Sequence, residues 1–173
     1  MKFKLTHSLV AIAMIASPLV FADDSKIYSG AHCDRHSGSD EYDRAGGAIR
    51  NLSETVDLVV MCPIVKDSVD MRILSASVMM RDRSTEAKVR CKIQSIFLTD
   101  TGGINKNLSI VAKTSGSGNI PQTEAIPDGV PDSGVGANHF MRCVIPPVDK
   151  GPSSVISYRV DEGSPTILTS PSS

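Results

Sequence analysis

Short runs of alternating apolar and polar residues constrain the fold of this chain more than any other sequence feature. The clearest run lies within residues 86–98, where the apolar and polar side chains fall on opposite faces of an extended backbone. The apolar set is Val89, Cys91 and Ile93, and the polar set is Lys88, Arg90, Lys92 and Gln94. This pattern is typical of a strand with one buried face and one cationic face toward solvent.

Comparable extended runs recur along the chain and are separated by turns rich in Gly, Pro, Asn and Asp. They cover residues 26–28, 48–51, 56–65, 71–81, 108–112, 140–145 and 154–160. No segment shows the period of an amphipathic helix. The sequence therefore predicts a single all-β domain, an antiparallel β-sandwich of about seven or eight strands that is Ig-like or jelly-roll-like. A closed β-barrel is the alternative.

One of these runs is apolar almost throughout. Residues 56–65 contain only one acidic residue and end in a cysteine, a proline and two aliphatic residues. An unbroken apolar run predicts a strand that is buried on both faces. Proline cannot donate to a strand ladder, so we expect the strand to end, or to lie at an edge, near Pro63.

Residues 1–22 have the layout of a cleaved secretory signal. Lys2 and Lys4 precede a short apolar run, and residues 20–22 offer small or modest side chains where a signal peptidase would cut. The run is shorter than the roughly 18 residues that a permanent membrane-spanning helix needs. We expect cleavage to leave residues 23–173 as one secreted or periplasmic domain without a transmembrane segment.

All four cysteines lie in this expected mature chain. They are Cys33, Cys62, Cys91 and Cys143. An even number of cysteines in an exported chain predicts two disulfides, for which three connectivities exist. We favour Cys33–Cys62 together with Cys91–Cys143, because Cys91 and Cys143 both lie in alternating strand segments. The paired short spacings of a zinc site are absent, and we expect no metal or other cofactor.

Four segments together resemble a loose group of exported proteobacterial proteins without an assigned function. They are VVMCPIV at 59–65, VRC at 89–91, MRCVIPP at 141–147 and ISYRV at 156–160. The resemblance spans most of the expected mature chain and rests on cysteine, proline and strand positions. It implies an exported, disulfide-linked architecture and brings no catalytic residue with it.

The sequence contains no motif of a nucleophile elbow, a zinc protease, a phosphate-binding loop, a dinucleotide site or an EF-hand. His139 is in phase with the apolar residues of its strand, which favours a structural role. His32 and His36 lie near acidic residues at 40–43, and a hydrolase site built from these groups is the alternative to a binding protein.

Composition narrows the ligands that we expect. The net charge is −1, there is no Trp, and only five aromatic residues follow the predicted signal. This argues against nucleic-acid binding and lowers the expectation of sugar binding, because both commonly use aromatic stacking. The stripe of Lys88, Arg90 and Lys92, with Arg142 and Arg159 as candidate neighbours, is interpreted as a solvated face. A site for an anionic partner is the alternative.

Residues 113–137 form the longest stretch without a strand pattern, and a loop of this length is functional or flexible. Its candidate binding residues are Ile120, Ile126, Asp128, Val130 and Asp132. We predict a non-enzymatic protein whose strands are scaffold and whose loop contacts an unidentified protein or surface partner. The Ser/Pro-rich tail from Gly163 is expected to be flexible.

Overall fold

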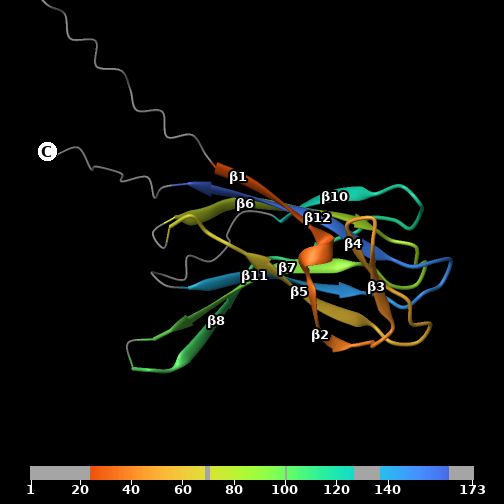
Figure 1. The fold of residues 1–173 in the computed structure, drawn as a ribbon, viewed down its shortest axis with the longest axis horizontal. Coiled ribbons are helices and arrows are strands. Elements are labelled where there is room, and N and C mark those ends of the chain that lie inside the picture. Colours follow the sequence, from red (N-terminus) through yellow and green to blue (C-terminus); the bar gives the residue numbers. More distant parts are fainter. Residues whose placement is uncertain (1–23, 69–70, 100, 127–136, 164–173) are drawn as a thin grey trace, which may run out of the picture.

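The computed structural model of the chain describes residues 24–68, 71–99, 101–126 and 137–163. These residues form two six-stranded antiparallel sheets that face one another (Figure 1). The first sheet contains β1 (Asp24–Ser29), β3 (Tyr42–Ala45), β4 (Ala48–Asn51), β6 (Arg72–Arg81), β10 (Gln122–Ile126) and β12 (Ser154–Gly163). The second contains β2 (Asp34–Gly38), β5 (Leu58–Ile64), β7 (Arg90–Leu98), β8 (Ile104–Leu108), β9 (Ala112–Lys113) and β11 (Asn138–Ile145).

Each sheet has its own strand order and its own free edges. The first runs β10-β6-β12-β4-β3, with β1 also paired to β12. The second runs β2-β5-β11-β7-β8, with β9 also paired to β7. The predicted sandwich is therefore confirmed, and the closed barrel is not formed. Among the described residues, a single turn of 3-10 helix (Gly30–His32) is the only helical element, and no helix is long and apolar enough to cross a membrane.

Burial along β5 alternates from residue to residue. Leu58, Val60, Cys62 and Ile64 are buried, whereas the residues between them face the outside of the sheet. The prediction that this strand is buried on both faces is wrong, because no third layer covers its outer face. The expectation for Pro63 is confirmed: β2 pairs with β5 only up to Met61, so Pro63 lies where that side of β5 is open.

The core lies between the two sheets and is centred on aliphatic side chains and Tyr158. Burying one such side chain contributes about 1.5–3 kcal/mol. Tyr158 is almost completely buried, stacks on Tyr28 with ring centroids 4.9 Å apart, and donates a hydrogen bond to the Pro63 carbonyl oxygen of the opposite sheet. Burial raises the pKa of the Tyr158 hydroxyl, which therefore remains a donor across the physiological pH range.

Both predicted disulfides are present. Cys33 bonds to Cys62, and Cys91 bonds to Cys143. Cys91 and Cys143 lie directly opposite each other on the neighbouring strands β7 and β11. Cys33 follows the 3-10 turn immediately before β2, and Cys62 lies in β5. Both cross-links therefore hold strands of the second sheet.

The predicted loop at residues 113–137 is partly regular structure. Its described part contains the end of β9 and the whole of β10, which pairs with β6 from Gln122 to Ile126. The side chain of Ile126 is only 3% exposed and belongs to the core. The interpretation of Ile126 as a residue of a binding loop is therefore wrong. Residues 108–112 also differ from the expected strand, because β8 ends at Leu108 and β9 begins at Ala112.

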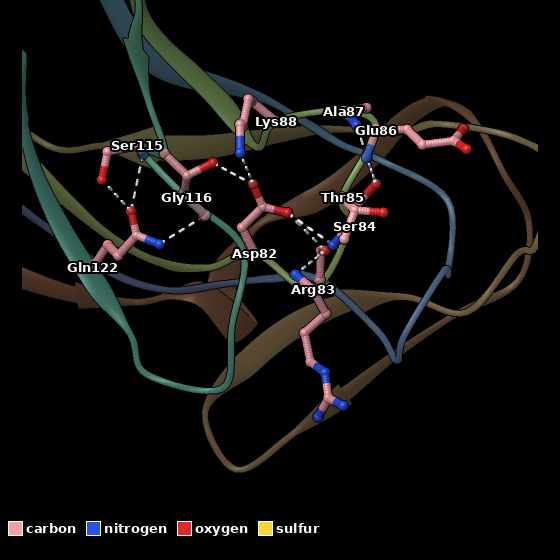
Figure 2. Close-up of polar contacts among 12 residues, drawn as sticks. Asp82, Arg83, Ser84, Thr85, Glu86, Ala87, Lys88, Ser115, Gly116 and Gln122 are labelled. Atoms are coloured by element: carbon pink, nitrogen blue, oxygen red, sulfur yellow. Dashed lines mark hydrogen bonds and ion pairs between the residues drawn. The ribbon is translucent and has the colours of Figure 1, made fainter.

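Hydrogen bonds hold the connection between β9 and β10 in place at one end of the sandwich (Figure 2). The fully buried carboxylate of Asp82 accepts hydrogen bonds from the Thr114 hydroxyl and, at 3.0 Å, from the Ser84 N–H. The Gly118 N–H donates to the Asp82 carbonyl at 2.7 Å. Gln122 accepts from the Ser115 N–H at 2.9 Å. Because its hydrogen bonds are satisfied, the buried carboxylate of Asp82 has a structural role and fixes the start of the β9–β10 connection.

Candidate functional site

The residues of the alternative hydrolase site lie on the surface, and two of its carboxylates are held in ion pairs. His32 and His36 are exposed, and each acidic neighbour at the ends of the 40–43 segment is engaged by an arginine. The hydrogen bonds and charge of Arg50 hold the pKa of the Asp43 carboxyl below its usual value. A carboxylate in a surface ion pair is a weak candidate for a general base. Within the described residues, no cluster of three His, Cys, Asp or Glu side chains could hold a metal ion.

His139 has the structural position that its phase in the sequence predicts. It is buried, and its Nδ1 lies 2.7 Å from the Oγ of Ser95 on the neighbouring strand β7. A serine–histidine contact is also found in hydrolases, but Ser95 is completely buried, and its hydroxyl cannot meet a substrate. The pair belongs to the inner face of the second sheet.

The candidate residues of the predicted binding loop do not come together in the described structure. Ile120 is 80% exposed, in the connection before β10, whereas Ile126 is in the core. Asp128, Val130 and Asp132 lie outside the described residues. The loop therefore provides no described binding site.

The described cations that are best placed to bind a ligand lie on the outer face of the second sheet. We call this surface the basic face and define its cations as Arg90 and Lys92 on β7, Arg142 on β11 and Lys113 on β9. The strand register places Lys92 directly opposite Arg142, and Arg90 directly opposite Lys113. Within the described part of the chain, none of the four side chains makes an ion pair or a hydrogen bond.

Two directly opposed pairs of like charge are unfavourable in a sheet. The side chains of Lys92 and Arg142 are also half-buried, so water screens their repulsion less than it would at a fully exposed position. This repulsion lowers the stability of the folded state. An anion bound over the outer face, between the side chains of Lys92 and Arg142, would relieve it. This arrangement distinguishes the basic face from the ordinary solvated surface that the sequence favoured.

A shallow groove of about 360 Å³ runs over the basic face. It is lined by Asp57, Val59, Arg90, Cys91, Lys92, Val111, Arg142 and Val144. Asp57 is the only acidic side chain in this lining. The guanidinium groups of Arg90 and Arg142 present planar sets of donors that match carboxylate, sulfate or phosphate oxygens. The groove can therefore hold an anionic group between cations that rigid strands position.

The predicted basic stripe is partly correct. Arg90, Lys92 and Arg142 come together, as the sequence suggested. Lys88 instead lies 4.0 Å from the buried carboxylate of Asp82, and Arg159 belongs to the other sheet, where it pairs with Asp161 at 2.8 Å. The sequence analysis missed Lys113, whose signal was faint, because β9 is only two residues long.

The register of the basic face could have been derived from the sequence. If Cys91 and Cys143 are bonded across two adjacent antiparallel strands, their neighbours Lys92 and Arg142 must also lie opposite each other. A disulfide between neighbouring antiparallel strands at Cys91 and Cys143 therefore implies that Lys92 faces Arg142.

No protein-family model matches the chain, and no protein of curated function matches it either. Among solved structures, it is similar to a low-affinity xylan-binding module, CBM86, from the gut symbiont Roseburia intestinalis, with 13% identity and a TM-score of 0.44 over 81% of this chain and 96% of that chain. It is also similar to a family two carbohydrate esterase from Cellvibrio japonicus, with 7% identity and a TM-score of 0.45 over 84% of this chain and 37% of that one. A mannan-recognising module, TmCBM27, shows 10% identity and a TM-score of 0.40 over 83% of this chain and 98% of that one. These likenesses are remote, and no ligand is carried over from them.

Proposed function

We propose that this chain is an exported, non-enzymatic binding protein that recognises an anionic ligand through the basic face. The observation that carries the proposal is the pair of like-charge contacts, Lys92 opposite Arg142 and Arg90 opposite Lys113. Neighbouring strands lie about 4.8 Å apart, so the four charges form a compact patch. The signal-like residues 1–22 and the two disulfides support an oxidising, secreted or periplasmic location.

The shape of the site supports binding rather than catalysis. Its groove is shallow and is floored by strands, and its lining contains no histidine or serine that could act as a base or a nucleophile. Aromatic support for a ligand is also small. Phe140 is half-buried on the outer face of β11, and it is the only aromatic side chain on the described outer faces of β5, β7 and β11. Charge, rather than stacking, is therefore the basis of recognition that we infer.

Reversing one charge tests the proposal. If Lys92 serves binding, its reversal should weaken ligand affinity while raising stability; if Lys92 serves the fold, its reversal should lower stability. Lys92→Glu would place a carboxylate opposite Arg142 and replace repulsion with attraction. We expect the variant to be more stable than the parent by ~0.5 to 1 kcal/mol and to bind dextran sulfate roughly tenfold more weakly, since it loses a charge-assisted contact and gains a repulsive one. Urea denaturation and a fluorescence titration measure the two effects.

Two controls make this experiment specific. Unmodified dextran has the same backbone as dextran sulfate without its charges, and the parent protein should not bind it. Lys150→Glu makes the same change of charge in the connection between β11 and β12, away from the groove lining, and should leave affinity within about twofold of the parent. Equal losses in Lys92→Glu and Lys150→Glu would mean that net charge alone drives binding, and the proposed site would be wrong.

A further inference from the structure

The outer faces of the two sheets differ in chemistry. On the first sheet, the outward positions of β1, β6, β10 and β12 carry several small hydroxyl side chains together with the Arg159–Asp161 ion pair. The hydroxyl residues are Ser25, Ser29, Ser75, Ser77, Thr123 and Ser157. The exposed side chains of Ile27 and Met79 lie among these polar groups, one beside Arg159 and the other beside Ser157. The outer face of the second sheet carries the basic face and, beside it, several exposed aliphatic side chains.

We call these aliphatic side chains the apolar rim. It consists of Ile104, Leu108, Ile110 and Val111, which are 76%, 46%, 60% and 44% exposed. Single exposed aliphatic residues are normal on protein surfaces. Four within eight consecutive residues form a patch of the kind that indicates an interaction site. The β8 strand that begins the rim lies at the edge of its sheet, remote from the first sheet (Figure 1).

The apolar rim and the basic face lie on the same side of the sheet. Leu108 is directly opposite Gln94, which is two residues from Lys92 along β7, and side chains two apart share a face. Ile104 is in phase with Leu108 along β8. Val111 lines the groove together with Arg90, Lys92 and Arg142. One surface therefore offers unpaired cations and exposed aliphatic groups side by side.

Hydrogen bonds to β7 fix the segment that carries Ile110 and Val111. The Ser109 N–H donates to the Ile93 carbonyl at 2.9 Å, and the Ile93 N–H donates to the Ser109 Oγ at 2.8 Å. Because Ser109 is anchored in this way, Ile110 and Val111 are held outward rather than folded onto the sheet. The exposure of these side chains is a property of the fold, and little further ordering is needed before they meet a partner.

We propose that this surface docks on an anionic lipid bilayer, with the cations of the basic face at the lipid phosphates and the apolar rim inserted at the boundary of headgroups and acyl chains. The inference deepens the proposed function and rests on it. A hydrated polyanion would neutralise Arg90, Lys92 and Arg142 but would leave Ile104 and Ile110 in water. A bilayer with anionic headgroups satisfies both parts of the surface, since it combines negative charge with an apolar interior.

Sedimentation with vesicles tests the inference on the full mature chain. Vesicles of equal parts phosphatidylglycerol and phosphatidylcholine should carry the protein down, whereas vesicles of phosphatidylcholine alone should not. Each cation near an anionic surface strengthens binding roughly fivefold, so Arg142→Gln should weaken sedimentation by about that factor. Raising the salt concentration from about 0.1 M to about 1 M should release the protein, because the Debye length falls from about 10 Å to about 3 Å.

A matched pair of variants isolates the apolar rim. Ile104→Ser combined with Ile110→Ser should weaken binding to the mixed vesicles by about tenfold or more, since two aliphatic side chains no longer enter the lipid. Ile27→Ser combined with Ile120→Ser removes two isoleucines that are 74% and 80% exposed elsewhere in the molecule, and it should leave vesicle binding unchanged. Equal weakening in both double variants would overturn the role of the rim.

The arms of the experiment separate this inference from the proposed function. If dextran sulfate binds in a manner that depends on Lys92 while neither vesicle sediments the protein, the anionic site stands and the bilayer is the wrong partner; an acidic polymer or an acidic protein would then be the ligand. If vesicles bind but the rim variant binds as well as the parent, the contact is electrostatic only, and insertion is wrong. If neither probe binds, both proposals fail.

Discussion

Replacing Cys91 and Cys143 together with alanine should lower the free energy of unfolding by about 4 kcal/mol, as the loop-entropy relation gives for a closed loop of this length. The bond joins residues 52 positions apart and links two central strands of the second sheet. Without it, the unfolded chain gains conformational freedom, and the core loses two buried sulfur atoms. Urea denaturation of the parent and the double variant, under the same conditions, measures the loss.

The second disulfide provides a comparison within the same molecule. Cys33 and Cys62 are 29 positions apart, so replacing both should cost slightly less, about 3.5 kcal/mol. A loss below about 1 kcal/mol in the Cys91/Cys143 variant would contradict the expectation, because it would mean that the folded sheet holds β7 against β11 without help from the bond.

Ile126→Asp should destabilise the protein by about 3 kcal/mol or more. The side chain of Ile126 is 3% exposed at the end of β10, so the substitution would remove apolar packing and place a carboxylate in the core. Ile120→Asp is the matched control, because Ile120 is 80% exposed in the preceding connection. It should change stability by no more than about 0.5 kcal/mol. Thermal and urea unfolding of both variants measure the difference.

Comparable effects at the two positions would contradict the assignment of Ile126 to the core. They would restore the original interpretation, in which residues 113–137 form a loop that keeps its isoleucines for a partner. The comparison therefore tests the structure at the point where it departs most clearly from the sequence prediction.

The architecture could be predicted because strong patterns encode it. Strands β7 and β11 bury every second residue over most of their length, so alternation identifies both of them. The disulfide pairing followed from the same patterns, since Cys91 and Cys143 each take the place of an inward-facing residue. Tyr158, in the extended run at residues 154–160, is buried in the core in the same way.

Strand β10 could not be predicted because only one of its five residues is fully buried. Among the described strands it pairs only with β6, at the edge of the first sheet, so its sequence is under weak apolar constraint. Polar contacts position it instead: Gln122 bonds to the nearby residues Ser115 and Gly116, and Asp82, which is distant in sequence, holds Thr114 and Gly118. A search for apolar periodicity does not detect polar contacts of either kind.

The candidate site was visible in part. The charges of Arg90 and Lys92 stand out on an alternating strand, but their neighbours depend on register. Arg159 was wrongly grouped with them because the sequence does not say to which sheet a strand belongs. The apolar rim could not be predicted for another reason. Residues 108–112 have the pattern of one continuous strand, and no sequence signal marks the interruption at Ser109 that turns Ile110 and Val111 outward.

Both disulfides hold strands of the second sheet, so the two sheets should differ in how readily their strands separate. Strand β7 cannot separate fully from β11 while the Cys91–Cys143 bond remains, and the Cys33–Cys62 bond ties β5 to the start of β2. Hydrogen bonds and packing alone join the strands of the first sheet. Partial opening should therefore begin with the edge strands β10 and β3, whose amide hydrogens should exchange with solvent long before those of β11. The second sheet, which carries the basic face, should therefore stay folded after the edge of the first sheet has opened. The surface that we propose for binding would persist in such a partly unfolded state.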